Sequence, residues 1–259
     1  MDSPSSGGPH DVPVAGARGA RTDGGHRMKL FLLELGMIRY YKDRPVCGYL
    51  IRCDDGTDVL VDTGPHRDAT PDSPIIARTD PGLLEQLAAV GVRPDDVDIV
   101  VCSHLDPDHA GNHDLFPGAE FVVQQSHLEL ARSGTEARLE ATRAQWDLPH
   151  LKYRTVDGDT TLLPGIELIE SGGHITGHQS VLVRLPRTGA VLLAVDAITQ
   201  EAAMDPDNRP MTRFDLDADA ARASTRKLVD LARRENAMVV RNHDPKQWPT
   251  LTQWPACYE

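Results

Sequence analysis

The segment 103–112 reads Ser-His-Leu-Asp-Pro-Asp-His-Ala-Gly-Asn and directly follows the apolar run 98–102. Imidazole and carboxylate side chains together suit Zn, Fe, Mn or Co, whereas carboxylates alone at every other position would suit Ca. The proline and the Gly-Asn pair are typical of turns, so we expect a loop that a buried strand positions. An acidic, solvated loop without a ligand is the alternative. The candidate ligands here are His104, Asp106, Asp108 and His109.

Three later positions strengthen the interpretation as a metal site. His174 lies in the glycine-rich segment 171–180, which reads Ser-Gly-Gly-His-Ile-Thr-Gly-His-Gln-Ser. Asp196 ends the apolar run 191–196, and His243 follows the segment Met-Val-Val-Arg-Asn at 238–242. Each of the three therefore lies at the end of a strand-like segment or in a glycine-rich turn, as the first group does.

In this order the motifs resemble the metallo-β-lactamase superfamily, and within it the N-acyl homoserine lactonase-like branch. The shared pieces are the His-x-x-x-Asp-His core, the Gly-His-x-x-Gly-His-Gln-Ser turn, the strand-end aspartate, the Asn-His-Asp near the C-terminus and Val-Asp-Thr-Gly at 61–64. The resemblance runs from about residue 28 to the C-terminus. It implies an α+β fold, a four-layer αββα sandwich, with the metals at one edge where strand ends converge.

The resemblance also implies a role for each candidate ligand. One metal would be held by Asp108, His109 and His243. The other would be held by His104, Asp106 and His174, with Asp196 bridging the two. Two divalent transition-metal ions, Zn first and Fe or Mn as alternatives, would share a water and lower its pKa, so that a metal-bound hydroxide attacks a substrate held by the same ions. Asp108 could orient this nucleophile or carry its proton to the leaving group.

Two positions depart from the branch pattern. Asp106 stands where the branch usually has His, which adds a negative charge and hardens the site, so that Fe or Mn is tolerated more readily. Thr199 stands where acyl homoserine lactonases tend to carry a Tyr that contacts the substrate carbonyl. Thr can donate a hydrogen bond but reaches less far, so we treat Thr199 as a candidate catalytic residue.

Further side chains are expected around the metals. Asp62 ends a strand and is expected to orient a ligating imidazole, and His178 is expected to support the site or to be structural. We expect His127 and His150 at the surface. Candidate walls of a substrate pocket, which are as well explained by ordinary packing, are Met37, Tyr40, Met204 and Phe214.

Composition narrows the possible partners. The 259 residues carry a formal net charge of −12, which disfavours nucleic acid and anionic membranes because both require a basic footprint. The four cysteines have no Cys-x-x-Cys spacing, so we expect reduced, structural thiols. No signal peptide or membrane-spanning run is recognisable, and we expect a cytoplasmic protein that acts on a small molecule.

Residues 1–27 contain scarcely any apolar cluster and are predicted to be a disordered extension, followed by one hydrolase domain at 28–259. Strands are predicted at 46–52 and 59–61 around the turn Asp-Asp-Gly, and at 98–102, 119–123, 161–169, 180–185 and 190–195. Helices are predicted at 81–90 with Asp80 as N-cap, through most of 124–146 with a break at Ser133-Gly134, and at 217–235.

The leading hypothesis is therefore a dinuclear metal-dependent hydrolase that opens a lactone or a related ester. A close variant keeps the metal chemistry but cleaves another activated C–O bond, such as that of an electron-poor aryl ether. From a different class, the carboxylate of Asp106 suggests a di-iron oxidoreductase, although no flavin-binding segment is recognisable to supply electrons. A non-catalytic binding protein on the same fold is the last alternative.

Overall fold

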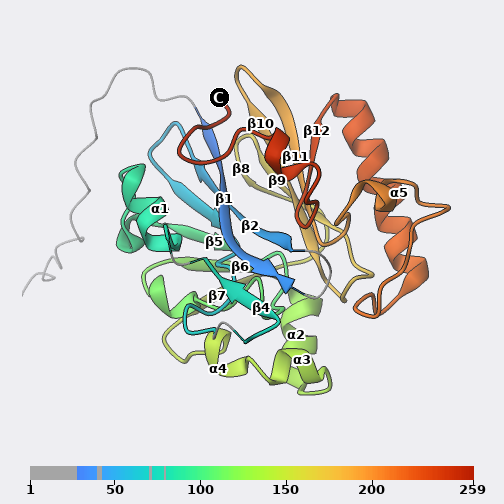
Figure 1. Ribbon diagram of the computed structural model, residues 1–259, viewed down its shortest axis with the longest axis horizontal. Coiled ribbons are helices and arrows are strands. Elements are labelled where there is room, and N and C mark those ends of the chain that lie inside the picture. The colour runs from blue at the N-terminus through green and yellow to red at the C-terminus, as the bar shows by residue number, and fades with distance from the viewer. Residues whose placement is uncertain (1–27, 40–42, 70–71, 79) are drawn as a thin grey trace, which may run out of the picture.

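The structure is a computed structural model that describes residues 28–39, 43–69, 72–78 and 80–259. Tyr40 and the proposed extension 1–27 lie outside these ranges. The described strands form two mixed sheets that face each other (Figure 1). The first contains β1 (Lys29–Ile38), β2 (Arg44–Arg52), β3 (Asp58–Val61), β4 (Ile75–Ala77), β5 (Ile99–Val101), β6 (Glu120–Gln124) and β7 (Lys152–Val156) in the order β4-β1-β2-β3-β5-β6-β7. The second contains β8 (Thr160–Leu163), β9 (Ile166–Glu170), β10 (Gln179–Leu185), β11 (Gly189–Val195) and β12 (Met238–Arg241) in the order β12-β11-β10-β9-β8.

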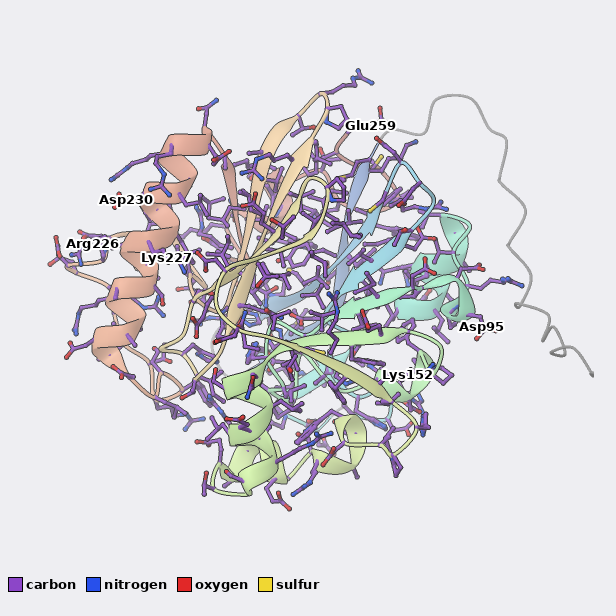
Figure 2. All side chains as sticks on the ribbon, turned by 180° about the vertical axis from the view of Figure 1, so that it is seen from behind. Asp95, Lys152, Arg226, Lys227, Asp230 and Glu259 are labelled. Carbon is purple, nitrogen blue, oxygen red and sulfur yellow. The ribbon has the colours of Figure 1, made fainter. Side chains whose placement is uncertain are left out.

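Helices cover the outer faces of both sheets. The seven-stranded sheet is accompanied by α1 (Leu83–Ala89), α2 (Gln125–Ser133), α3 (Ala137–Glu140) and α4 (Arg143–Trp146), and α5 (Ala218–Glu235) flanks the five-stranded sheet (Figure 1). Short 3₁₀ segments are η2 (Pro94–Asp96), η3 (His113–Leu115), η4 (Glu201–Met204) and η5 (Trp248–Thr250). On α5, Arg226 and Asp230 lie on the side away from the sheet, whereas the Lys227 ammonium donates to the Glu170 carbonyl of β9 at 2.7 Å (Figure 2).

Three clusters of buried apolar side chains correspond to the three interfaces between layers. One joins the seven-stranded sheet to its helices and includes Leu87 of α1 and Leu128 of α2. The second fills the space between the sheets, where side chains of β1–β3 meet those of β9–β12. The third joins Leu192 of β11 to Leu228 of α5. This layer order confirms the predicted α+β, four-layer αββα sandwich.

Both sheets end their parallel strands at the same edge of the sandwich. β3 and β5 are parallel, with Val61 opposite Val101, and β11 and β12 are parallel, with Val195 opposite Arg241. The residues that follow these strands are the polar ones that the sequence singles out. Asp62 has φ = 60° and Val195, just before Asp196, has φ = 47°. Left-handed backbone at a non-glycine residue is strained, and such strain concentrates at functional sites.

Several element boundaries differ from the prediction. The region 161–169 forms two strands, β8 and β9, the region 124–146 forms three helices, α2 to α4, and β4 was not predicted. Helix α1 begins at Leu83 and not at Pro81, because the Glu85 carboxylate accepts the backbone N–H of Gly82 at 2.5 Å and caps the helix there. Asp80 is therefore not its N-cap. Strand β7 was not predicted, because its residues are exposed or half-buried and lack a clear apolar face. Among the described residues, no helix combines the length and the apolar composition needed to cross a membrane.

The start of α5 offers a test of the local structure. The side chain of Asp217 accepts hydrogen bonds from the backbone N–H groups of Asp219 and Ala220, at 3.0 and 2.9 Å. Asp217→Ala removes this cap and should lower the free energy of unfolding by about 1 kcal/mol, measured by urea denaturation followed by circular dichroism. The matched control Asp230→Ala, in the exposed middle of the same helix, should change it by less than about 0.5 kcal/mol. Equal losses in the two variants would contradict the capping role.

Candidate metal centre

Two of the buried histidines are held by strong hydrogen bonds at Nδ1. His109 Nδ1 lies 2.8 Å from Asp62 Oδ2, and His243 Nδ1 donates to the carbonyl oxygen of Pro45 at 2.7 Å. A carbonyl oxygen and a carboxylate can only accept, so both imidazoles carry the proton on Nδ1. Their Nε2 lone pairs are therefore available to a cation.

His104 is oriented through a serine. Ser103 Oγ donates its single proton to Asp62 Oδ2 at 2.7 Å, and the same Oγ lies 2.9 Å from His104 Nδ1. Since the hydroxyl proton is already used, His104 Nδ1 must donate to Oγ, which again leaves Nε2 as the lone-pair nitrogen. Asp62, which also accepts the Ser103 N–H at 2.8 Å, thus orients His109 directly and His104 through Ser103.

His174 is the fourth such imidazole. Its Nδ1 lies 3.5 Å from Asp215 Oδ1, and its position depends on close packing against α5. Gly173 has φ = 125°, and a Cβ there would collide with the backbone of Ala221. The backbone N–H of Asp217 donates to the Gly173 carbonyl at 2.9 Å. The glycine-rich turn therefore lets the first turn of α5 press His174 towards the other histidines.

The four Nε2 atoms face three carboxylates in two groups. In the first, Nε2 of His104 and of His174 lie 3.5 and 3.2 Å from Asp106 Oδ2. In the second, Nε2 of His109 and of His243 lie 3.6 and 3.5 Å from Asp108 Oδ2. Asp196 lies between the groups. Its Oδ2 is 3.6 Å from His174 Nε2, and its Oδ1 is 3.4 Å from His109 Nε2 and 3.0 Å from His243 Nε2.

This arrangement fits a metal ion in each group. Among the described residues, Nε2 of His104 and of His109 are buried without a hydrogen-bond partner, and leaving such an atom unsatisfied costs about 1–3 kcal/mol. Neutral imidazole nitrogen and carboxylate oxygen are the donors that Zn, Fe and Mn accept. Two sets of three donors, each within 4.8 Å of one another, are His104, His174 and Asp196, and Asp108, His109 and His243.

The electrostatics of the buried carboxylates and imidazoles also favour the binding of cations. Burial alone would raise the pKa of Asp196, but His243 and His109 outweigh it and hold the pKa well below its ordinary value. Burial lowers the pKa of His174, yet the carboxylates of Asp106 and Asp215 outweigh it and raise the pKa to about 9. The carboxylate of Asp196 is therefore anionic and attracts cations, protons as well as metal ions.

Two other buried histidines accept a backbone N–H at Nε2, so that lone pair is not available to a metal ion. His178 accepts the backbone N–H of Asp196 at Nε2, at 3.2 Å, and contacts Ser171 Oγ through Nδ1, at 2.9 Å. It therefore fixes the backbone of Asp196. His127 is fully buried, accepts the Leu105 N–H at 2.9 Å and contacts the Thr176 carbonyl at 2.7 Å. The prediction of a surface position for His127 is wrong, because this histidine joins two loops of the centre.

Of the side chains predicted to form a substrate pocket, the structure describes Met37, Met204 and Phe214, and each has different neighbours. Met37 of β1 lies opposite Pro45, whose carbonyl binds His243. Met204 packs against the apolar cluster beneath α5, so the structure gives it a packing role. Phe214 is exposed, and its carbonyl accepts a hydrogen bond from Arg138. Thr199 is half-buried three residues after Asp196.

Three contributors to the centre were missed by sequence reasoning. Asp215 lies behind His174 and is itself paired with the buried Arg209, at 3.2 Å. Arg138 of α3 reaches Asp106, with Nε 3.0 Å from Oδ1. Asn242 donates to Asp196 Oδ1 at 3.2 Å. Only Asn242 carried a signal, its place at the end of an apolar run beside His243.

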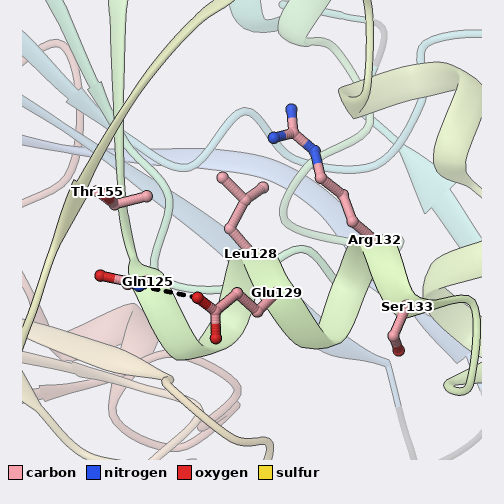
Figure 3. Close-up of a pocket in the computed structure, with 6 residues that line it drawn as sticks. All are labelled: Gln125, Leu128, Glu129, Arg132, Ser133 and Thr155. Atoms are coloured by element: carbon pink, nitrogen blue, oxygen red, sulfur yellow. Dashed lines mark hydrogen bonds between the residues drawn. The ribbon is translucent and has the colours of Figure 1, made fainter.

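A hollow of about 560 Å³ on the surface of α2 is separate from this centre (Figure 3). It is lined by Gln125, Leu128, Glu129, Arg132, Ser133 and Thr155. Its single carboxylate, that of Glu129, already accepts a hydrogen bond from Gln125 at 2.8 Å. The hollow offers no histidine and no set of ligands, so the chemistry lies with the histidine cluster.

The fold and the site together indicate the class of protein to which the chain belongs. Residues 42–243 match the profile of the metallo-beta-lactamase superfamily, and the chain belongs to this superfamily. It is a metal-dependent hydrolase, as predicted from the sequence.

The relatives narrow the comparison to one branch. An N-acyl homoserine lactonase of Bacillus thuringiensis is 30% identical over 223 residues, which cover 82% of this chain and 86% of the relative. One of Azorhizobium caulinodans is 36% identical over 196 residues, covering 71% and 72%. An N-acyl homoserine lactone hydrolase with the product N-hexanoyl-L-homoserine bound at its catalytic metal centre superimposes with a TM-score of 0.79 at 25% identity, over 90% of this chain and 99% of the other. The resemblance to the lactonase-like branch is confirmed.

The orienting role of Asp62 can be tested by Asp62→Asn, which keeps the size of the side chain and tolerates φ > 0. Loss of the carboxylate should weaken zinc binding by about 10–100-fold, because an unoriented imidazole is a poorer ligand. Competition of the apoprotein against a chelating dye measures this. Asp98→Asn is the matched control, since Asp98 accepts a backbone N–H at 3.0 Å at the opposite end of the same strands. Unchanged zinc affinity in Asp62→Asn would show that the carboxylate does not orient the ligands.

Proposed function

We propose that the chain is a dinuclear metal-dependent lactonase whose substrates are N-acyl homoserine lactones or lactones of similar shape. The observation that carries the proposal is the pair of donor groups joined by Asp196, whose oxygens face one group each. The named activity of relatives that share most of their length with this chain supports the substrate class.

In this proposal one ion is held by His104, Asp106 and His174 and the other by Asp108, His109 and His243, with Asp196 between them. When bound, the ions supply Lewis acidity for the lactone carbonyl and lower the pKa of the attacking water. Zinc is the first candidate, and iron or manganese follow. Location in the cytoplasm stays a prediction from the sequence.

The chain's own residues would divide the remaining work. The partners at Nδ1 hold the proton on that nitrogen and aim the Nε2 atoms at the centre. Asp108 Oδ2 faces the Nε2 atoms of His109 and His243, and this carboxylate would hold the proton of the attacking water and pass it to the leaving alkoxide. Thr199 would donate a hydrogen bond to the substrate.

An apolar surface lies beside His174. Phe214 and Leu216 are exposed to 37% and 48%, and the backbone N–H of Leu216 donates to the His174 carbonyl at 3.1 Å. Exposed apolar side chains next to a polar centre suit a ligand with an apolar tail. We propose that the acyl chain of the substrate lies along this surface.

The substrate class is tested by hydrolysis of a panel containing acyl homoserine lactones, simple lactones, aryl esters and electron-poor aryl ethers. We expect about two transition-metal ions per chain by elemental analysis, turnover of the lactones above the other compounds, and complete loss of turnover after chelation with recovery on adding Zn, Fe, Mn or Co. Lactones left intact by protein that holds two ions would overturn the substrate class. Absence of bound metal after reconstitution would overturn the hydrolytic centre.

The proposed contact between the acyl chain and the surface of Phe214 and Leu216 is tested separately by Phe214→Ala. Loss of the ring should lower kcat/KM for long-chain acyl homoserine lactones by about fivefold, equivalent to about 1 kcal/mol of apolar contact, and leave short-chain substrates nearly unchanged. Leu84→Ala is the control, because Leu84 is exposed to 39% on α1. A uniform loss over all chain lengths would show that Phe214 does not contact the tail.

A further inference from the structure

Arg138 distinguishes two donor groups that are otherwise alike. Each group offers one aspartate and two imidazoles, and the two share Asp196. Among the described residues, a guanidinium contacts only the group of His104, Asp106 and His174, with Arg138 Nε 3.0 Å from Asp106 Oδ1. Asp108 has no arginine or lysine among the contacts of the described residues. The two donor groups therefore differ in that one of them has a positive charge beside it.

The two oxygens of the Asp106 carboxylate face different partners. Oδ2 faces the Nε2 atoms of His104 and His174 at 3.5 and 3.2 Å, while Oδ1 faces Arg138. The side chains of Asp106 and Arg138 are exposed to only 8% and 18%, so their interaction is poorly screened by water. The negative charge that Asp106 brings to its group is thus opposed by the positive charge of Arg138.

Arg138 is also held in place. Nη1 donates to the Phe214 carbonyl at 3.0 Å and Nη2 to the His174 carbonyl at 3.4 Å, while Glu136 Oε1 lies 3.9 Å from Nε. The guanidinium joins α3 to the two segments that carry His174 and Phe214. Because backbone carbonyls fix it, it cannot move far when a second cation enters the group.

We propose that Arg138 sets the order and strength of metal binding. The Asp108, His109 and His243 group binds first and tightly. The Asp106 group binds second and weakly, because Arg138 opposes both its aspartate and the incoming ion. This inference rests on the proposed dinuclear centre and adds to it an unequal pair of sites, the second of which exchanges its metal readily.

The test is a zinc titration of apoprotein against a chelating dye, which yields two dissociation constants without any assay of turnover. In the wild-type protein we expect two separate steps. Arg138→Gln and Arg138→Met remove the charge and should tighten the second step by on the order of tenfold or more, with little effect on the first. Arg138→Lys keeps the charge and should leave both steps within about twofold of the wild type.

Arg143→Met is the matched control, because Arg143 lies on the adjacent helix α4 and pairs with Asp147 at 3.0 Å. It should leave both constants unchanged. Circular dichroism of each apoprotein identifies a variant that has not folded, and the second neutral variant then replaces it. An unchanged or weaker second step in a folded neutral variant would overturn the role of Arg138, as would equal tightening in Arg138→Lys. Wild-type protein that binds no zinc would overturn the proposed centre itself.

Discussion

Everything in the centre depends on which nitrogen of each imidazole carries the proton. A neutral imidazole has one donor and one lone pair, so a partner that binds Nδ1–H decides that Nε2 faces inward. Asp62, Ser103, Pro45 and Asp215 provide these partners from four different segments. His178 and His127 differ in that Nε2 of each accepts a backbone N–H, so these two histidines brace the loops instead. Sequence spacing cannot make this distinction, but hydrogen bonding can.

The sandwich fold brings these hydrogen-bond partners together at one edge. Parallel pairing of β3 with β5 and of β11 with β12 brings the ends of four strands to one edge. The edge is polar although the strands that lead to it are almost entirely apolar. Burying several carboxylates there is costly unless cations compensate them. Arg138 and Arg209 compensate two of them, Asp106 and Asp215, and metal ions would compensate the remainder.

Sequence reasoning succeeded where side-chain type and periodicity carry the information. Most strands and helix α5 followed from apolar patterns, the four layers followed from the family resemblance, and the candidate ligands followed from motifs that lie at strand ends. It failed where a residue acts from a distant segment. Arg138 and Asp215 lie in polar stretches with no motif, and only folding brings them to Asp106 and His174. His127 was placed at the surface because an isolated histidine has no pattern, whereas Met204 proved to belong to the packing beneath α5.

The central claim is that two ions lie on either side of Asp196. The most direct measurement is anomalous diffraction at the zinc edge from crystals of the zinc-loaded protein. Two anomalous peaks are expected, one among Nε2 of His104, Nε2 of His174 and Asp106, the other among Nε2 of His109, Nε2 of His243 and Asp108, with an oxygen of Asp196 next to each. A single peak at full loading, or peaks ligated through Nδ1 or by residues outside these groups, would contradict the claim.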